Sequence, residues 1–258
     1  MRSLLFSACT ALLCLTTTAA FAADPTLEEI LAQNLEARGG QEAIDAIKTM
    51  RATGKMSMGP MEMPMQLEAR EPGQIRMEFT MQGMTAIQSY DGKQAWQVMP
   101  FMGKPDPEAM GADEAKQIKD NGDIKGDLIN WKAKGHKVSL VGKETLEGTE
   151  VWKLKIDKAS GDTVYAFLDA EYFLEIAQQA KVKVQGQEME TSTTIGDYKE
   201  VAGVQMAHSV IVNAKTPMGE MKQAITIDKV EVNVEFPADH FSMPKVEPKP
   251  ATDAPAKP

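Results

Sequence analysis

Two stretches near the start of the chain alternate strictly between apolar side chains and polar residues or proline. The alternation runs through residues 61–68 and again through residues 75–82. Alternation with a period of two puts every second side chain on the same face of a β-strand. Glu71-Pro72-Gly73 separates the two stretches and Asp91-Gly92 follows them, and both are turn sequences. The pattern predicts antiparallel strands with one apolar and one polar face.

Similar strand signals return after Lys137 and continue to residue 234. The candidate strands, separated by turn residues, are 137–145, 150–157, 162–169, 173–184, 187–198, 205–214 and 220–234. A helix precedes them all, because Thr26-Leu27-Glu28-Glu29 forms a capping box, apolar residues follow at helical spacing, and Gly39-Gly40 ends the segment. Periodicity therefore predicts a mainly β fold, in which a meandering antiparallel sheet closes toward a barrel.

Residues 103–135 interrupt the strands. This stretch is rich in Gly, Asp, Lys and Pro, and helix-like patterns occupy residues 107–119 and 124–132. Long insertions of this kind are commonly functional lids. We expect a loop with helices here, and we expect Leu128, Ile129 and Trp131 to form a lid.

Both chain ends differ in composition from the middle. Residues 1–22 have a basic Arg2, an apolar run and a final Ala20-Phe21-Ala22, which is the pattern of a secretory signal peptide cleaved near Ala22. Residues 245–258 are rich in Pro, Lys and Ala and predict a disordered tail. The chain is therefore expected to be periplasmic, with one domain over residues 23–244.

The sequence contains no catalytic motif and no histidine or cysteine pattern of a metal site. The only two cysteines, Cys9 and Cys14, lie inside the leader, and neither has the context of a good lipidation site. His136, His208 and His240 lack metal-ligand spacing, and no nucleophile elbow or phosphate-binding loop occurs. The net charge of −9 argues against a nucleic-acid partner. We expect a binding protein without a cofactor, and not an enzyme.

Methionine is the unusual residue of this chain. Eleven of its eighteen methionines lie between Met50 and Met102. Three interpretations are open. The methionines form an apolar surface that adapts to several ligands, or they simply fill a core, or they bind Cu(I) or Ag(I) through their thioethers. The residues that would supply that metal site are Met56, Met58, Met61, Met63 and Met65.

Several short motifs resemble the periplasmic outer-membrane lipoprotein carriers and lipoprotein-sorting proteins of the LolA and LolB type. The segments that carry the resemblance are 71–79, 89–96 with 99–101, 142–145, 148–149, 153–154, 197–201 with 203–204, and 233–236 with Phe241 and Pro244. One departure concerns the family's arginine before the proline of a strand turn. Glu71 occupies that place here, and Arg70 lies one position earlier, which would be on the opposite face of a strand.

The resemblance implies an incomplete antiparallel β-barrel of about 11 strands, wrapped over an N-terminal helix and a helical lid. It further implies an apolar cavity for acyl chains, a role as a carrier in outer-membrane lipoprotein sorting, and lipid or acylated lipoprotein cargo exchanged with membrane-bound donor or acceptor proteins. We assign the cavity wall to Met56, Met58, Met63, Met65, Met77, Phe79, Met81, Trp96 and Val98. A Cu(I)- or Ag(I)-binding protein and an envelope-stress sensor on the same fold are the alternatives.

Overall fold

The computed structural model describes residues 24–184, 187–216 and 219–245. The predicted leader, and all of the predicted tail except Lys245, lie outside these residues. Within them, no helix is both long enough and apolar enough to cross a membrane.

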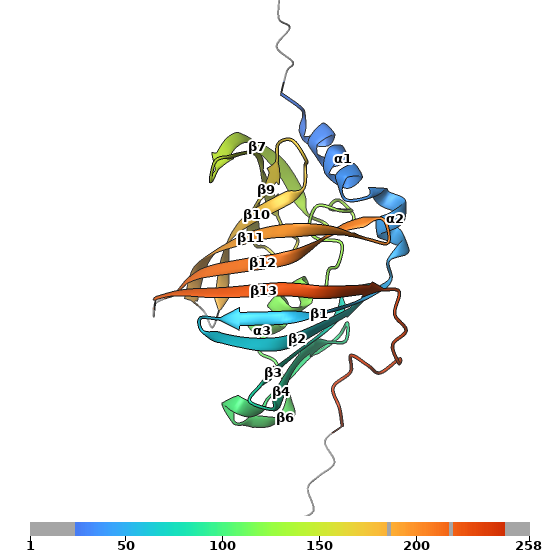
Figure 1. Cartoon of the computed structure of the whole chain (residues 1–258), viewed down its shortest axis with the longest axis vertical. Helices are drawn as coiled ribbons and strands as arrows, with labels where there is room; N and C mark the ends of the chain where they lie inside the picture. The colour runs from blue at the N-terminus through green and yellow to red at the C-terminus, as the bar shows by residue number, and fades with distance from the viewer. Residues whose placement is uncertain (1–23, 185–186, 217–218, 246–258) are drawn as a thin grey trace, which may run out of the picture.

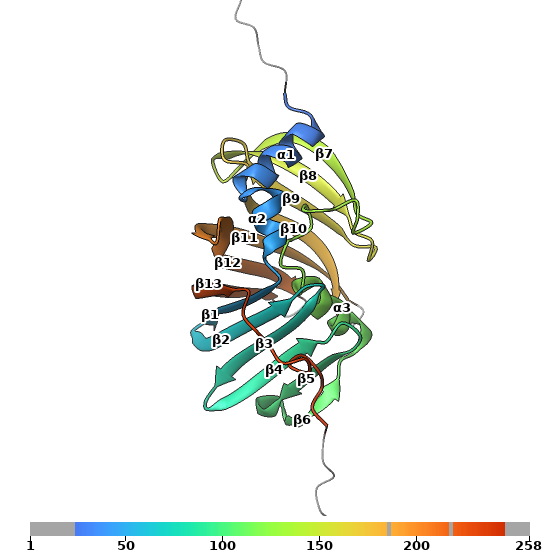
Figure 2. The same ribbon diagram turned by 90° about the vertical axis from the view of Figure 1, so that its right-hand side faces the viewer.

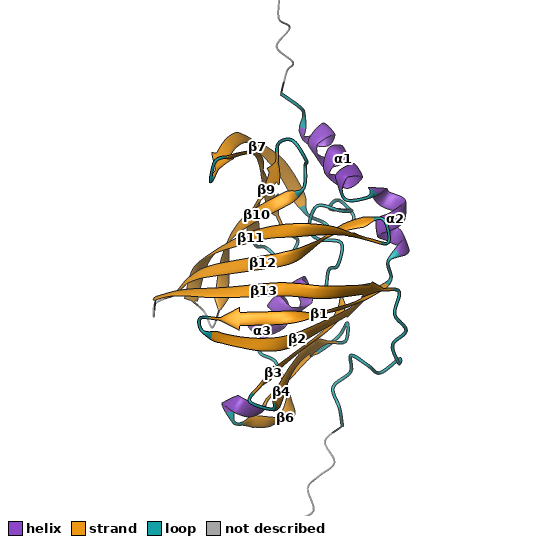
Figure 3. Ribbon diagram, viewed as in Figure 1, coloured by secondary structure: helices purple, strands orange, loops and turns teal. Residues whose placement is uncertain are grey.

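The strands form a single open antiparallel sheet (Figure 1 and Figure 3). The described residues contain thirteen strands: β1 (Thr49–Met58), β2 (Met61–Arg70), β3 (Gln74–Met81), β4 (Met84–Tyr90), β5 (Ala95–Met99), β6 (Lys104–Ala109), β7 (Lys137–Leu146), β8 (Thr149–Asp157), β9 (Thr163–Asp169), β10 (Glu175–Val184), β11 (Gln187–Val201), β12 (Val204–Thr216) and β13 (Gly219–Val232). Their order is β6-β5-β4-β3-β2-β1-β13-β12-β11-β10-β9-β8-β7, so the first strand pairs with the last in the middle of the sheet. The predicted incomplete barrel is confirmed.

Three α-helices accompany the sheet, namely α1 (Leu27–Ala37), α2 (Gly40–Ala46) and α3 (Ala112–Asn121), with a short 3-10 helix at Pro100–Met102. The capping box of α1 is present, since Glu29 N donates to Thr26 Oγ1 and Thr26 N donates to Glu29 Oε2. Gly39 turns the chain from α1 into α2 with a φ of 114°. A side chain there would also collide with the backbone of Gly203, so only glycine fits.

Strand register separates the two faces of the sheet, because residues directly opposite each other across a strand pair share a face. One inner-face row joins Leu154, Ala166, Gln178, Thr193, Val212, Gln223, Met58 and Met61. We call the face that carries this row, and that packs against the helices, the inner face. Figure 2 shows α1 and α2 over one half of the sheet and α3 beside the other half.

The helices cover separate parts of the inner face. Ile30 of α1 packs with Leu154, Ile156 and other side chains of β7–β9. Ile44 of α2 packs with Val204 of β12. Ile118 of α3 packs with Ile75 of β3 and Ala95 of β5. The inner face is thus closed at both halves by different helices.

The segment after β13 crosses the outer face of β1–β5. We call residues 233–242 the C-terminal strap. Trp96 Nε1 and Ser89 Oγ both donate to the backbone oxygen of Phe241, at 2.8 and 2.9 Å. The Phe241 side chain is only 1% exposed. The strap therefore buries an outer face that strand alternation alone would leave to solvent.

Two details of residues 103–135 differ from the sequence prediction. Residues 104–109 form strand β6, which raises the strand number above the expected eleven or so. The predicted helix over 124–132 is wrong, because these residues form bends and turns. Gly126 and Asn130 both have positive φ values, of 75° and 57°, which a continuous α-helix does not allow.

We expect Phe241→Ala to destabilise the fold by about 3 kcal/mol, because it leaves a cavity beneath the strap. Urea unfolding monitored by tryptophan fluorescence measures the loss. Met102→Ala is the control, since Met102 is 67% exposed and its truncation should change the stability by less than about 0.5 kcal/mol. Equal unfolding midpoints for the two variants would show that the strap does not stabilise the sheet.

Candidate functional site

Seven of the predicted wall residues lie together on the inner face of β1–β3. They are Met56, Met58, Met63, Met65, Met77, Phe79 and Met81, and Leu67 and Ile225 join them. We call this group the methionine cluster. Met56, Met63 and Met65 are buried, while the others are partly exposed. No side chain of α1, α2 or α3 belongs to the cluster, but Phe101 of the 3-10 helix packs against Phe79, with 5.8 Å between the ring centroids.

Trp96 and Val98 do not share this face, and their assignment to the wall is wrong. Trp96 lies opposite Ser89 and Val98 opposite Ile87, on the outer face. The ring of Trp96 is fully buried and bonded to the strap. The outer face of β5 carries apolar side chains because the strap covers it. The assignment failed because we expected the apolar side chains of a half-buried strand to face the helices.

The predicted lid residues lie elsewhere in the core. Leu128 and Trp131 pack with α1 and β7–β9, and Ile129 packs with α2. Neither group shares a member with the methionine cluster. The nearest helix to that cluster is instead α3, because Met77 and Leu67 contact both the cluster and the group around Ile118.

A band of the inner face between the helix-covered halves is only partly buried. We call this surface the inner trough, and its side chains are Gln178, Ala180, Thr193, Ile195, Val210, Val212, Gln223, Ile225 and Met58. Six of these nine side chains are apolar, and the surface runs across β10–β13 into the methionine cluster. Alternation along residues 204–214 could have revealed Val210 and Val212, but the concentration of methionines drew the prediction to β1–β3.

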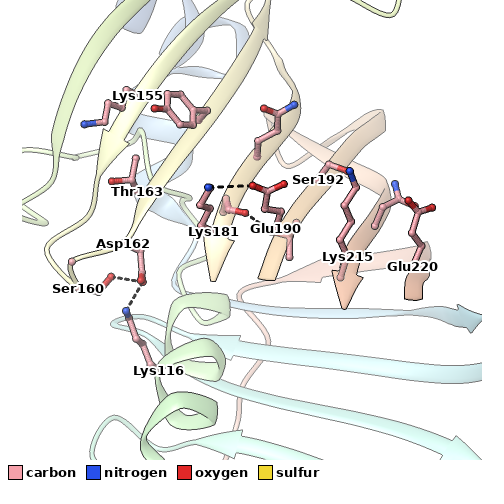
Figure 4. A pocket seen from close by; sticks show the side chains of 17 residues that line it. Lys116, Lys155, Ser160, Asp162, Thr163, Lys181, Glu190, Ser192, Lys215 and Glu220 are labelled. Carbon is pink, nitrogen blue, oxygen red and sulfur yellow. Dashed lines mark hydrogen bonds and ion pairs between the residues drawn. The ribbon is translucent and has the colours of Figure 1, made fainter. Parts of the chain in front are cut away.

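One end of the trough meets a polar cavity of about 1100 Å³ (Figure 4). Its lining includes Ala180, Thr191 and Ala214, which form one inner-face row. Four lysines and three carboxylates also line it: Lys116, Lys155, Lys181, Lys215, Asp162, Glu190 and Glu220. None of the predicted methionines lines this cavity.

Ion pairs join the parts of the cavity wall. Lys116 of α3 reaches Asp162 in the turn between β8 and β9, at 2.5 Å. Lys181 and Glu190 pair across β10 and β11 at 3.2 Å. Figure 4 shows Lys116 pointing from α3 across to Asp162. Lys181, Glu190, Lys215 and Glu220 form one outer-face row, so the cavity reaches round the strand ends and offers both signs of charge there.

Glu175 is an acidic group on the inner face, opposite Leu168. Burial raises the pKa of its carboxyl to about 7, and the hydrogen bond from Gln178 only partly opposes that effect. Tyr198 Oη donates to the backbone oxygen of Glu175 at 2.7 Å, and burial also raises the pKa of Tyr198. No sequence signal marks this polar spot, because one glutamate in an acidic chain does not stand out.

Charged contacts hold residues 122–136 in place. Lys125 pairs with Asp45 of α2 at 2.7 Å, Lys158 pairs with Asp127 at 3.1 Å, and Lys134 pairs with Asp123. The residues of the last two pairs line a second cavity of about 480 Å³, which Glu71 also lines. Burial raises the pKa of Glu71.

Arg70 does not take a latch role on the inner face. Its guanidinium donates to the backbone oxygens of Phe236 and Pro237, at 2.7 and 3.1 Å, and lies over the ring of Phe241. Arg70 is thus a partner of the strap on the outer face. In the part of the chain that the structure describes, no group of three His, Cys, Asp or Glu side chains could hold a metal ion.

Comparison with known proteins adds a fold relationship. No protein-family model matches the chain, and no curated protein matches it. A LolA superfamily protein from Nitrosomonas europaea superposes with a TM-score of 0.57 at 12% identity, over 84% of this chain and 98% of that one. A domain assigned to outer membrane lipoprotein sorting from Vibrio parahaemolyticus gives 0.55 at 13% identity, over 82% and 94%.

The chain has a LolA-like fold. A DUF1329 family protein from Desulfovibrio piger also superposes, with a TM-score of 0.56 at 9% identity, over 83% of this chain and 96% of that one. These similarities establish the architecture on which the trough and the methionine cluster lie. What a LolA-like fold binds depends on the side chains of its own inner face.

We expect Glu175→Gln to change how stability depends on pH. The pKa of Glu175 in the folded protein lies above the ordinary value of 4.5. Below pH 4.5 its carboxyl is therefore protonated in both the folded and the unfolded protein, and folding buries no charge. As the pH rises from 4.5 to 7, the unfolded state ionises first and the wild type loses stability relative to Glu175→Gln, by about 3 kcal/mol at most. Denaturant unfolding of both proteins at pH 4, 5, 6, 7 and 8 measures the difference in their free energies of unfolding. A difference that stays the same at every pH would contradict the prediction.

Proposed function

We propose that this protein is a periplasmic binding protein for the acyl chains of lipids or lipoproteins, which it carries in the inner trough and against the methionine cluster. Partners in this role are lipid or acylated lipoprotein cargo and membrane-bound proteins that deliver or accept it. The proposal includes export by the leader at residues 1–22 and involves no catalysis and no nucleic acid. The LolA-like fold supports it, and so does the resemblance of the motifs described above.

The observation that carries the proposal is an apolar inner surface that the helices leave partly exposed. Helices α1 and α2 cover the half of the sheet around β7–β9 and β12, while α3 packs on β3–β5 and also reaches β10. Between them, the methionine cluster and the trough keep partly exposed apolar side chains. A protein interior is normally filled to crystal-like density, so such a surface suits an apolar ligand.

Methionine fits this task better than leucine or valine. Burying each CH₂ group of an acyl chain contributes about 0.8 kcal/mol, so a long chain gains affinity without hydrogen bonds. A carrier must also release its ligand and accommodate chains of different shape. The unbranched thioether of Met58, Met77 or Met81 can change rotamer to follow the ligand, since all three are only partly buried.

The polar cavity at the end of the trough suits the polar end of such an amphiphile. An acyl chain lying along Val212 and Ala180 would bring its headgroup toward Lys116 of α3, the wall lysine that comes from an inner-face helix. Ammonium groups and hydroxyls can pair with phosphate or amide oxygens there. The apolar side chains of the trough and the polar cavity at its end together favour a lipid-like ligand over a purely apolar molecule.

Organic extracts of the protein purified from the periplasm test this function directly. We expect mass spectrometry to find a lipid or an acylated peptide in the extract. The extract of Phe79→Glu, purified identically, is the comparison. Protein that carries no acyl compound and does not enhance the fluorescence of an apolar dye would overturn the proposal.

We expect Phe79→Glu to weaken binding of a fluorescent fatty acid at least tenfold. The new carboxylate would lie among Met65, Met77 and Met81, where contact with an acyl chain would desolvate it. Val141→Glu is the matched control, because Val141 is 54% exposed on β7, away from the trough, and should leave affinity unchanged. Titration followed by fluorescence measures both, and Phe79→Ala separates the effect of charge from that of lost contacts.

A further inference from the structure

The tip of the β1–β2 hairpin places four methionines on one face in two opposed pairs. Met56 lies directly across from Met63, and Met58 directly across from Met61. Residues two apart on a strand share a face, so all four side chains leave the sheet on the inner face. We call them the methionine square.

The spacing of a β-sheet brings the four thioethers within reach of one point. Opposed Cβ atoms lie about 5 Å apart, and residues two apart on a strand lie about 7 Å apart. The centre of such a rectangle is about 4 Å from each Cβ, which the three rotatable bonds of methionine can span to a shared ion. This spacing therefore permits three or four sulfurs to coordinate one ion.

The four methionines of the square become more exposed toward the tip of the hairpin. Met56 and Met63 are 5% and 4% exposed, Met58 is partly buried, and Met61 is 48% exposed. A small ion could enter past Met61 at the tip and be held by sulfurs that water scarcely reaches. This access does not require the sheet to open.

The square lacks the oxygen ligands that would attract a hard cation. Glu62 points to the outer face and pairs there with Lys55 at 2.9 Å. Ser57, between Met56 and Met58, is also on the outer face. The neighbour across β13 from Met58 is Gln223, a neutral amide. Thioethers without carboxylates favour soft monovalent ions over Zn²⁺, Mg²⁺ or Ca²⁺.

Methionine is also an unusual choice for these strand positions. Strands favour β-branched and aromatic side chains, which pack well on a pleated surface, and an apolar tip could be built from valine or isoleucine. Four thioethers at consecutive inner positions on both sides of one turn supply soft ligands, which those residues cannot. We propose that the methionine square of the β1–β2 hairpin binds a soft monovalent metal ion, Cu(I) or Ag(I). This site is a function in addition to acyl-chain binding.

The first experiment measures Cu(I) affinity by competition with bicinchoninate under ascorbate. It uses the full chain with Cys9→Ser and Cys14→Ser, which removes the only two thiols. We expect one Cu(I) per chain, and at least a tenfold weaker affinity when Met58→Leu and Met61→Leu are combined. Leucine keeps the volume and apolar character, so the fold should persist. Met84→Leu, at the neighbouring β3–β4 hairpin, is the matched control and should bind like the parent.

Failure of the parent protein to compete with bicinchoninate would overturn the proposal. So would an unchanged affinity in the Met58→Leu, Met61→Leu protein, or an equal loss in Met84→Leu. Circular dichroism of each variant shows whether a loss comes from unfolding. No lipid enters this measurement and no metal enters the lipid extraction, so either proposal can fail without the other.

A second experiment locates the ion. Ag(I) nitrate is titrated into protein whose methionine methyl groups carry ¹³C, and each signal is assigned by a single Met→Leu replacement. We expect the methyl signals of Met56, Met58, Met61 and Met63 to shift together and to saturate at one equivalent. Shifts confined to other methionines, or scattered without saturation, would refute the site.

Discussion

Pairing between β1 and β13 is the contact on which the rest of this structure depends. It joins the first strand to the last, from Met50 opposite Val232 to Met58 opposite Gln223. Without it, β1–β6 and β7–β13 would be two separate sheets and the trough would end at β13. The register shifts between Thr53 and Gly54, and a side chain on Gly54 would collide with the backbone oxygen of Thr226. Glycine at this position permits the close approach that makes the inner face continuous.

Much of the fold could be predicted from the sequence, because most strands bury one face only. Alternation located the methionine strands and placed Met63, Met65, Met77 and Phe79 on a common face. The capping box of α1 was equally readable. These signals are local, so they need no knowledge of distant segments.

The errors arose where a distant segment decides the outcome. Trp96 looked like an inner residue because Gln97 beside it is polar. The strap covers the outer face there, and Gln97 points inward and donates to Glu108 at 3.0 Å. The segment 124–132 has helical spacing, yet Gly126 and ion pairs with other elements hold it in turns. The polar cavity could not be predicted either, since its wall combines α3 with six strands and a turn.

The two faces of the sheet differ in chemistry at β10–β13. The middle of the inner face is largely apolar and only partly buried, while Lys181, Glu190, Lys215 and Glu220 form a charged outer-face row at the strand ends. On β1–β5 the outer face is instead covered by the strap, through its contacts with Arg70 and Trp96. The strap leaves the inner face of these strands unblocked.

Photo-crosslinking with a fatty acid that carries a diazirine on its chain tests most directly whether the methionine-lined face holds acyl chains. Trypsin cleavage gives one peptide over residues 56–70 and another over 77–93, which together carry most of the methionine cluster. We expect the adducts to be concentrated on these two peptides and to be suppressed by unlabelled fatty acid. Adducts spread over the whole chain, or confined to the outer-face strap at residues 233–242, would contradict it.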